Sequence, residues 1–168
     1  MLANLAFPLA LLTAILTALG TGSLFAFSNF VMGALNRLPP ANAISAMQSI
    51  NIVVINPLFM VAFMGAAVCF AALAIAAVAQ PWSATTLLVL AAALLYIIGM
   101  IGVTMIFNVP LNNGLATVDP SSADAPSIWS AYHGGWQMWN HIRTTAGTLS
   151  LVLLILAVAR MRDAVGGP

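Results

Sequence analysis

The fold is decided by residues 85–107, TTLLVLAAALLYIIGMIGVTMIF, because this stretch runs for 23 residues without a charged side chain. A helix needs about 20 predominantly apolar residues to cross a hydrocarbon core of about 30 Å. Further apolar runs of sufficient length lie on either side of it in the sequence. We therefore predict four transmembrane helices, at about residues 5–35, 52–79, 85–107 and 136–160.

The composition supports the same fold class. Charged residues make up 4% of the chain and hydrophobic residues 62%, and Lys and Glu do not occur. A soluble domain carries about 25% charged residues, so this composition excludes that class. Transmembrane β-strands would show alternating segments of about ten residues, which this sequence lacks. We predict an all-α integral membrane four-helix bundle, with residues 1–168 as one domain. The first run is expected to remain in the mature protein, because it exceeds the ~7–15 apolar residues of a signal peptide.

Prolines and tryptophans predict where the helices end. Pro39 and Pro40 are expected to stop the first helix. Residues 41–55 are then expected to form a short interfacial helix, and Pro110 is expected to end the third long helix sharply. An aromatic belt before the fourth helix is expected from Trp129, Trp136 and Trp139.

Several classes of partner are excluded by the sequence. There is no basic stripe, so a nucleic-acid partner is not expected. Cys69 is the only cysteine, so it forms no disulfide within the chain and is expected to be buried. The Glu-rich di-iron pattern of helical bundles needs Glu, which is absent, and the two histidines follow no metal-binding spacing. We predict no metal and no cofactor, and expect a lipid bilayer and a lipophilic small molecule as partners. A homo-oligomer stays open as an alternative, with residues 85–107 as its contact.

The few arginines predict the orientation. Arg160 and Arg162 follow the last apolar run, and the positive-inside rule places such residues in the cytoplasm. Four crossings then place both termini there. The expected location is the plasma (inner) membrane.

Polar side chains gather at one membrane face of the predicted bundle, while the opposite face has Gln80, Ser83 and the arginines of the tail. Each polar residue in so apolar a chain is costly in lipid and points to a function. The asymmetry predicts a polar pocket between helix ends that opens to one side. Its candidate residues are Asn29, Asn36, Arg37, Gln48, Asn51, Asn56, Asn108, Asn112, Asn113, His133, Gln137, Asn140, His141 and Arg143.

The fourth helix carries the densest polar group. At 100° per residue, Trp136, Asn140, Arg143 and Gly147 fall near one stripe. An arginine at this depth costs about 2–3 kcal/mol unless it pairs or reaches the interface. Arg143 is therefore an interfacial anchor, a partner for backbone carbonyls at a broken helix, or a clamp for an anionic oxygen.

The two histidines have different predicted environments. His141 lies inside the fourth span, where it is a packing or capping residue, a general base with a pKa near neutrality, or a metal ligand. His133 precedes Gly134 and Gly135 and is expected in the loop before the helix.

Three segments carry a resemblance to a known family. They are Asn56-Pro57-Leu58-Phe59, Asn108-Val109-Pro110-Leu111-Asn112-Asn113-Gly114 and Asn140-His141-Ile142-Arg143. With four spans, the chain resembles the anthrone oxygenase-like family of small membrane proteins. The resemblance implies a four-helix membrane bundle. For the named members it also implies oxidation of anthrones to anthraquinones by O2 without a metal or flavin.

The implied chemistry assigns roles to residues of this chain. A base removes a proton from the substrate methylene, the carbanion reacts with O2, and the hydroperoxide loses water. The predicted catalytic residues are His141 as base, and Arg143 and Asn140 as donors to the developing oxyanion. The predicted substrate-binding residues are Asn29, Asn51, Asn56, Asn108, Asn112, Trp136 and Trp139. The alternative function is a non-catalytic small-molecule-binding or complex-assembly membrane protein.

Overall fold

The computed structural model describes residues 2–165, and within this range the chain forms helices and short connections without a strand. Four of the described helical runs are long and apolar enough to cross a membrane. They span Ala6–Leu35, Pro57–Val78, Ala84–Ala116 and Ala125–Arg162. The predicted all-α fold class is confirmed.

The first half of the chain contains two long helices and a short one between them. α1 (Leu2–Ala26) continues through the π-helical segment η1 (Phe27–Val31) into α2 (Met32–Leu35). α3 (Pro40–Val53) follows, as the sequence predicts, and a short break separates it from α4 (Pro57–Val78). Each of these two helices begins with a proline, at a position where the missing N–H is not needed. The second span therefore begins at residue 57 rather than 52.

The third run stays helical past the proline that was expected to end it. It consists of α5 (Ala84–Leu94), the π-helical segments η2 (Leu95–Gly102) and η3 (Thr104–Asn108), and α6 (Val109–Ala116). Pro110 is the second residue of α6 and directly follows the wider turn of η3. A π-helical turn has no need of the α-type hydrogen bond that proline lacks, and it relieves the clash of the ring with the preceding turn. The predicted end near residue 107 is therefore wrong.

The last helix, α7 (Ala125–Val165), begins earlier than the predicted start near residue 136. The reason is packing, because Trp129, Tyr132 and Trp136 are buried in one cluster with Met47 of α3 and Leu115 of α6. Trp129 and Trp136 are only 4% and 3% exposed, so they form no lipid-facing belt. His133 consequently lies in a helix and not in the predicted loop.

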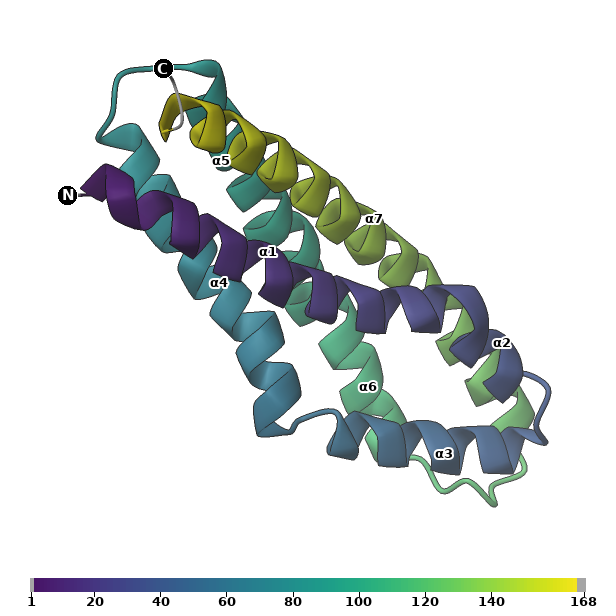
Figure 1. Ribbon diagram of the computed structural model, residues 1–168. Helices are drawn as coiled ribbons and strands as arrows, with labels where there is room; N and C mark the ends of the chain where they lie inside the picture. The colour runs from purple at the N-terminus through teal and green to yellow at the C-terminus, as the bar shows by residue number, and fades with distance from the viewer. Residues whose placement is uncertain (1, 166–168) are drawn as a thin grey trace.

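Each of the four long helical runs packs against two of the others. α1 contacts α4 and α7, and α5 contacts the same two helices from the other side. In Figure 1, α1 and α4 diverge from the N-terminal end of the molecule, and α3 lies across the far end. α3 contacts α6 and α7 there. α1 begins and α7 ends at the side opposite α3 (Figure 1), as expected for an even number of crossings.

The apolar core lies between the helices away from α3. Phe70, Tyr96, Met100 and Leu154 are almost fully inaccessible in it. The Tyr96 hydroxyl donates to the Phe63 carbonyl at 2.8 Å, so this polar group is satisfied. Helix η2 also approaches α7 closely through a glycine, since a Cβ at Gly99 would lie 2.6 Å from the Cβ of Ala146.

Gly99→Ala is expected to lower the melting temperature of the detergent-purified protein. The added methyl would meet the Cβ of Ala146, which cannot move without its backbone, and overpacking of this kind costs about 1–3 kcal/mol. Gly22→Ala is the matched control, because a Cβ there meets nothing within 4 Å and alanine is the better helix former. A Gly99→Ala variant as stable as the wild type would contradict the close approach of η2 and α7.

Candidate functional site

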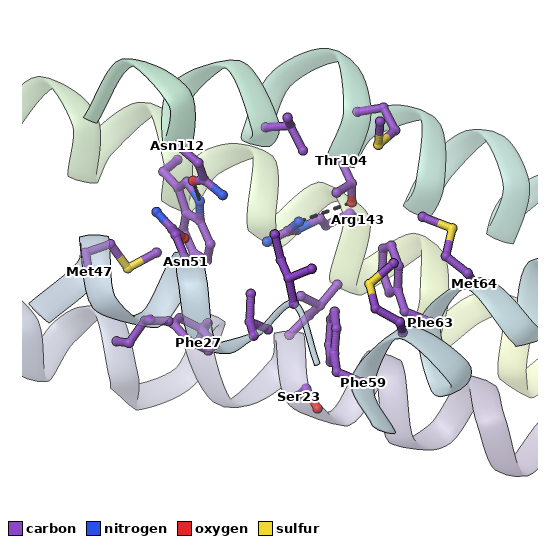
Figure 2. Close-up of a pocket in the computed structure, with 18 residues that line it drawn as sticks. Ser23, Phe27, Met47, Asn51, Phe59, Phe63, Met64, Thr104, Asn112 and Arg143 are labelled. Atoms are coloured by element: carbon purple, nitrogen blue, oxygen red, sulfur yellow. Dashed lines mark hydrogen bonds between the residues drawn. The ribbon is translucent and has the colours of Figure 1, made fainter. Parts of the chain in front are cut away.

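A cavity of about 310 Å³ lies where α1 and α4 diverge and α3 crosses (Figure 2). Its wall is mainly apolar and comes from α1, η1, α3, α4, η3, α6 and α7. Aromatic and thioether side chains make up much of that wall, namely Phe27, Phe59, Phe63, Trp136, Met47, Met60, Met64 and Met105. The polar lining residues are Ser23, Asn51, Thr104, Asn112 and Arg143. Ile55 and Met105 at its rim are 72% and 53% exposed, so the cavity is open to its surroundings.

Arg143 is the charged residue of this lining and is only 5% exposed. Its Nε and Nη2 donate to Asn140 Oδ1 at 3.0 and 2.8 Å, and its Nη1 donates to Thr104 Oγ1 at 3.1 Å. The guanidinium carbon also lies 5.0 Å from the centre of the Trp136 ring, within range of a cation–π contact. All these partners are neutral. Three of the five guanidinium N–H groups are used, so two remain for a ligand.

Asn140 holds Arg143 in place from behind the cavity. It is fully buried, and its Nδ2 donates to the Leu24 carbonyl at 3.0 Å and to Ser28 Oγ at 2.7 Å. Both ends of the amide are therefore committed, with Oδ1 facing the guanidinium. Asn140 does not line the cavity, so in the structure it positions Arg143.

Asn112 is also held in one orientation. Its Oδ1 accepts from the Tyr132 hydroxyl at 2.9 Å and from Trp136 Nε1 at 2.8 Å. Asn51 lines the same cavity from α3, and its buried Nδ2 has no hydrogen-bond partner. Figure 2 shows Asn51 and Asn112 near one end of the cavity and the pair of Arg143 and Thr104 nearer its middle.

The structure brings together part of the predicted site. Arg143, Asn51, Asn112 and Trp136 all line the cavity. The predicted stripe of the fourth helix is also present, since Trp136, Asn140 and Arg143 are buried on one side of α7.

His141 lies away from the cavity. It is exposed in a groove on the outer side of α1 and α7, beside Ser28 and Thr144. Arg143 lies two positions further along α7, and at 100° per residue the two side chains point to nearly opposite sides of the helix.

The other predicted site residues also lie outside the cavity. Asn29 is exposed, and Asn56 caps α4 by accepting from the Phe59 N–H at 3.0 Å. Trp139 stacks on Phe107, with ring centres 3.5 Å apart. Asn108 is buried and donates to the Trp136 carbonyl at 3.1 Å, so it supports α7 from η3.

Sequence reasoning missed Thr104 and Tyr132, which hold Arg143 and Asn112 respectively. A threonine in an apolar span usually bonds its own helix, and Thr104 does donate to the Met100 carbonyl at 2.7 Å. The signal that could have found both is helical spacing. Tyr132 lies four residues before Trp136 on α7, and Thr104 lies four residues before Asn108 on the third long helix.

Metal-binding residue types do not gather in the structure. Across residues 6–162, whose side chains the structure describes, no group of three or more His, Cys, Asp or Glu could hold a metal ion. His133 is half-buried beside Trp129, and its buried Nε2 has no hydrogen-bond partner. Cys69, expected to be buried, is half-buried.

Comparison with known proteins gives one match. The sequence model of a family described as anthrone oxygenase matches residues 59–153, more than half of the chain. The matched range includes Asn112, Trp136 and Arg143, whereas α1 and α3 lie before it. No curated protein and no solved structure matches.

Asn140→Leu is expected to destabilise the detergent-purified protein. The change leaves two Arg143 N–H groups and the Leu24 carbonyl without their partner, and a buried unsatisfied group costs about 1–3 kcal/mol. Asn29→Leu, at an exposed position of η1, is the matched control. Thermal unfolding followed by tryptophan fluorescence should show a clearly lower midpoint for Asn140→Leu alone. Equal midpoints for the two variants would argue against the role of Asn140.

Proposed function

The chain belongs to the anthrone oxygenase family, and on that premise we propose that it is a membrane-embedded oxygenase acting on a planar, lipophilic phenol or anthrone. The substrate binds in the cavity beside Arg143, with its ionised oxygen on the guanidinium. The observation that carries this proposal is a buried arginine in the wall of a mainly apolar cavity, which has only neutral partners and two N–H groups without a hydrogen bond among the described residues.

The environment of Arg143 favours an anionic ligand. A buried charge without a counter-charge is costly, so binding an anion there recovers free energy. The guanidinium is always protonated and offers donors in a fixed plane, which suits an oxyanion. Few polar groups surround it, and electrostatic attraction is stronger in such a setting than in water.

The rest of the lining suits a flat apolar molecule. Phe27 and Trp136 lie with ring centres 5.5 Å apart, and Phe59 stacks on Phe63 at 5.3 Å. Aromatic side chains of this kind pack against the faces and edges of planar rings. The methionines adapt their shape to whichever ring substituents are present.

The reaction balances with O2 as the oxidant. The substrate methylene loses one proton, and its electron pair moves into the ring system, which places negative charge on the oxygen at Arg143. The carbon then forms a bond to O2, which is reduced to the peroxide level by that electron pair, and a proton completes the hydroperoxide. Loss of the remaining C–H proton and cleavage of the O–O bond release water and form the new carbonyl. The net change is CH2 plus O2 to C=O plus H2O.

Proton removal needs no base from the cavity wall. The lining contains neither His nor a carboxylate. A cation beside the substrate oxygen favours the ionised form and so lowers the pKa of the bound substrate. Water at the open rim can then accept the proton. His141, in the outer groove, has no role in this scheme.

Arg143→Met is expected to reduce anthrone-dependent O2 uptake about 100- to 1,000-fold, the usual effect of removing an oxyanion donor. Arg143→Lys keeps the charge but loses the planar fork, so an intermediate rate is expected. Arg37→Met, at an exposed position, is the control. Uptake is measured on detergent-purified protein with and without a chelator, after gel filtration has shown that each variant is folded. Full uptake by Arg143→Met would contradict the proposal, and a wild type no faster than the spontaneous reaction would favour the non-catalytic alternative.

His141→Ala is expected to keep the wild-type rate within about threefold, because its side chain faces the outer groove. A general base contributes about 100- to 10,000-fold to a rate. A loss of 100-fold or more in the same assay would therefore identify His141 as the base and contradict the scheme without one.

A further inference from the structure

We propose that Asn112 recognises a second oxygen of the ligand, separate from the oxyanion at Arg143, and so determines specificity. The inference rests on the proposed function in one respect, namely that the ligand occupies the cavity beside Arg143. The ligand then carries two acceptor oxygens, an anionic one at Arg143 and a neutral one at Asn112.

The orientation of the Asn112 amide follows from its partners. The indole N–H of Trp136 can only donate, so the atom that faces it at 2.8 Å must be the amide oxygen. The Tyr132 hydroxyl donates to the same oxygen at 2.9 Å. Two donors occupy both lone pairs of Oδ1, so Asn112 offers a ligand only the two N–H groups of Nδ2.

The side-chain amide of Asn51, at the same end of the cavity as Asn112, has no acceptor for its N–H groups among the described residues. The Nδ2 of Asn51 is buried without a hydrogen-bond partner, and an unsatisfied buried donor costs free energy until something accepts from it. Its side chain approaches the Tyr132 hydroxyl, which donates to Asn112, but makes no hydrogen bond of acceptable geometry with it. An acceptor oxygen placed between the two amides would satisfy both.

The chemistry of the ligand follows from these groups. Arg143 and Asn112 are both donors with a fixed orientation, and Figure 2 shows them at separate places along the cavity. The amide end has no cation in its lining, so it suits a neutral oxygen such as a carbonyl or an ether. The wall between them is mainly apolar. The ligand class is therefore a planar lipophile with an ionised oxygen and a distant neutral acceptor.

Two probes that differ by one acceptor oxygen test this inference, namely 2-naphthoate and 6-methoxy-2-naphthoate. The carboxylate takes the place of the oxyanion at Arg143. Isothermal titration of the detergent-purified full chain should show about 3- to 10-fold tighter binding of the methoxy probe, the usual range for one hydrogen bond. Asn112→Leu should remove that preference, so that the variant binds the two probes with equal affinity. Asn113→Leu, one residue further along the same helix and exposed, should keep the preference.

Tyr132 is a positioning residue in this scheme, and its variant gives a second test. Tyr132→Phe removes one of the two donors that orient Asn112, so the preference for the methoxy probe should fall while 2-naphthoate still binds. If Asn112→Leu binds neither probe, Tyr132→Phe decides the test. A Tyr132→Phe variant that prefers the methoxy probe as strongly as the wild type does would overturn the inference.

Three other outcomes would also overturn it. They are equal binding of both probes by the wild type, a preference that survives in Asn112→Leu, and binding of neither probe. The naphthoates have no methylene to oxidise, so their binding is measured independently of O2 uptake. Failure of the oxygenase assay is thereby distinguishable from failure of this inference.

Discussion

The contact of Arg143 with Asn140 is the constraint on which the site depends. A guanidinium placed among apolar side chains must be held by hydrogen bonds, and Asn140 supplies two of the three that Arg143 makes. Asn140 in turn bonds to the backbone of α1 through Leu24. One asparagine therefore connects two of the long helices and fixes the direction of the charge. The third bond, to Thr104, connects the same charge to η3, so three separate segments meet at one side chain.

The cavity beside this charge exists because α1 and α4 pack against each other along only part of their length. Near the N-terminal end, α1 and α4 pack against each other, and Phe70, Tyr96 and Leu154 fill the space between the helices. Toward the other end α1 and α4 diverge (Figure 1), and α3 closes part of the opening by packing on α6 and α7. The second apolar cluster, around Trp129 and Trp136, supports that closure. The site thus lies between two well-packed regions and not within either.

Much of this arrangement could be predicted from local sequence. Apolar length gave the four crossings, and helical periodicity placed Asn140 and Arg143 on one side of α7. The family resemblance, drawn from three short segments, is confirmed by the family match over residues 59–153.

Pro110 misled the prediction because its tolerance depends on the π-helical turn before it, which has no clear sequence signature. The imidazole of His141 has the chemistry of a general base, but helical periodicity places it nearly opposite Arg143 on α7. The apolar wall could not be predicted, because Phe59, Phe63 and the methionines meet only through the packing of separate helices.

The unequal lengths of the helices set the depth of the cavity in a bilayer. α4, with 22 residues, is about 33 Å long and matches a hydrocarbon core, whereas α7, with 41 residues, is about 60 Å long. α7 must therefore extend beyond a hydrocarbon core that α4 matches. Phe59 and Phe63, which line the cavity, lie in the first two turns of α4, so in a bilayer whose hydrocarbon core α4 matches they would lie near one edge of that core. Amphiphilic ring compounds with one ionised oxygen partition to that same level. For the ligand class proposed above, occupancy of the site would then follow its concentration in the leaflet and not its solubility in water.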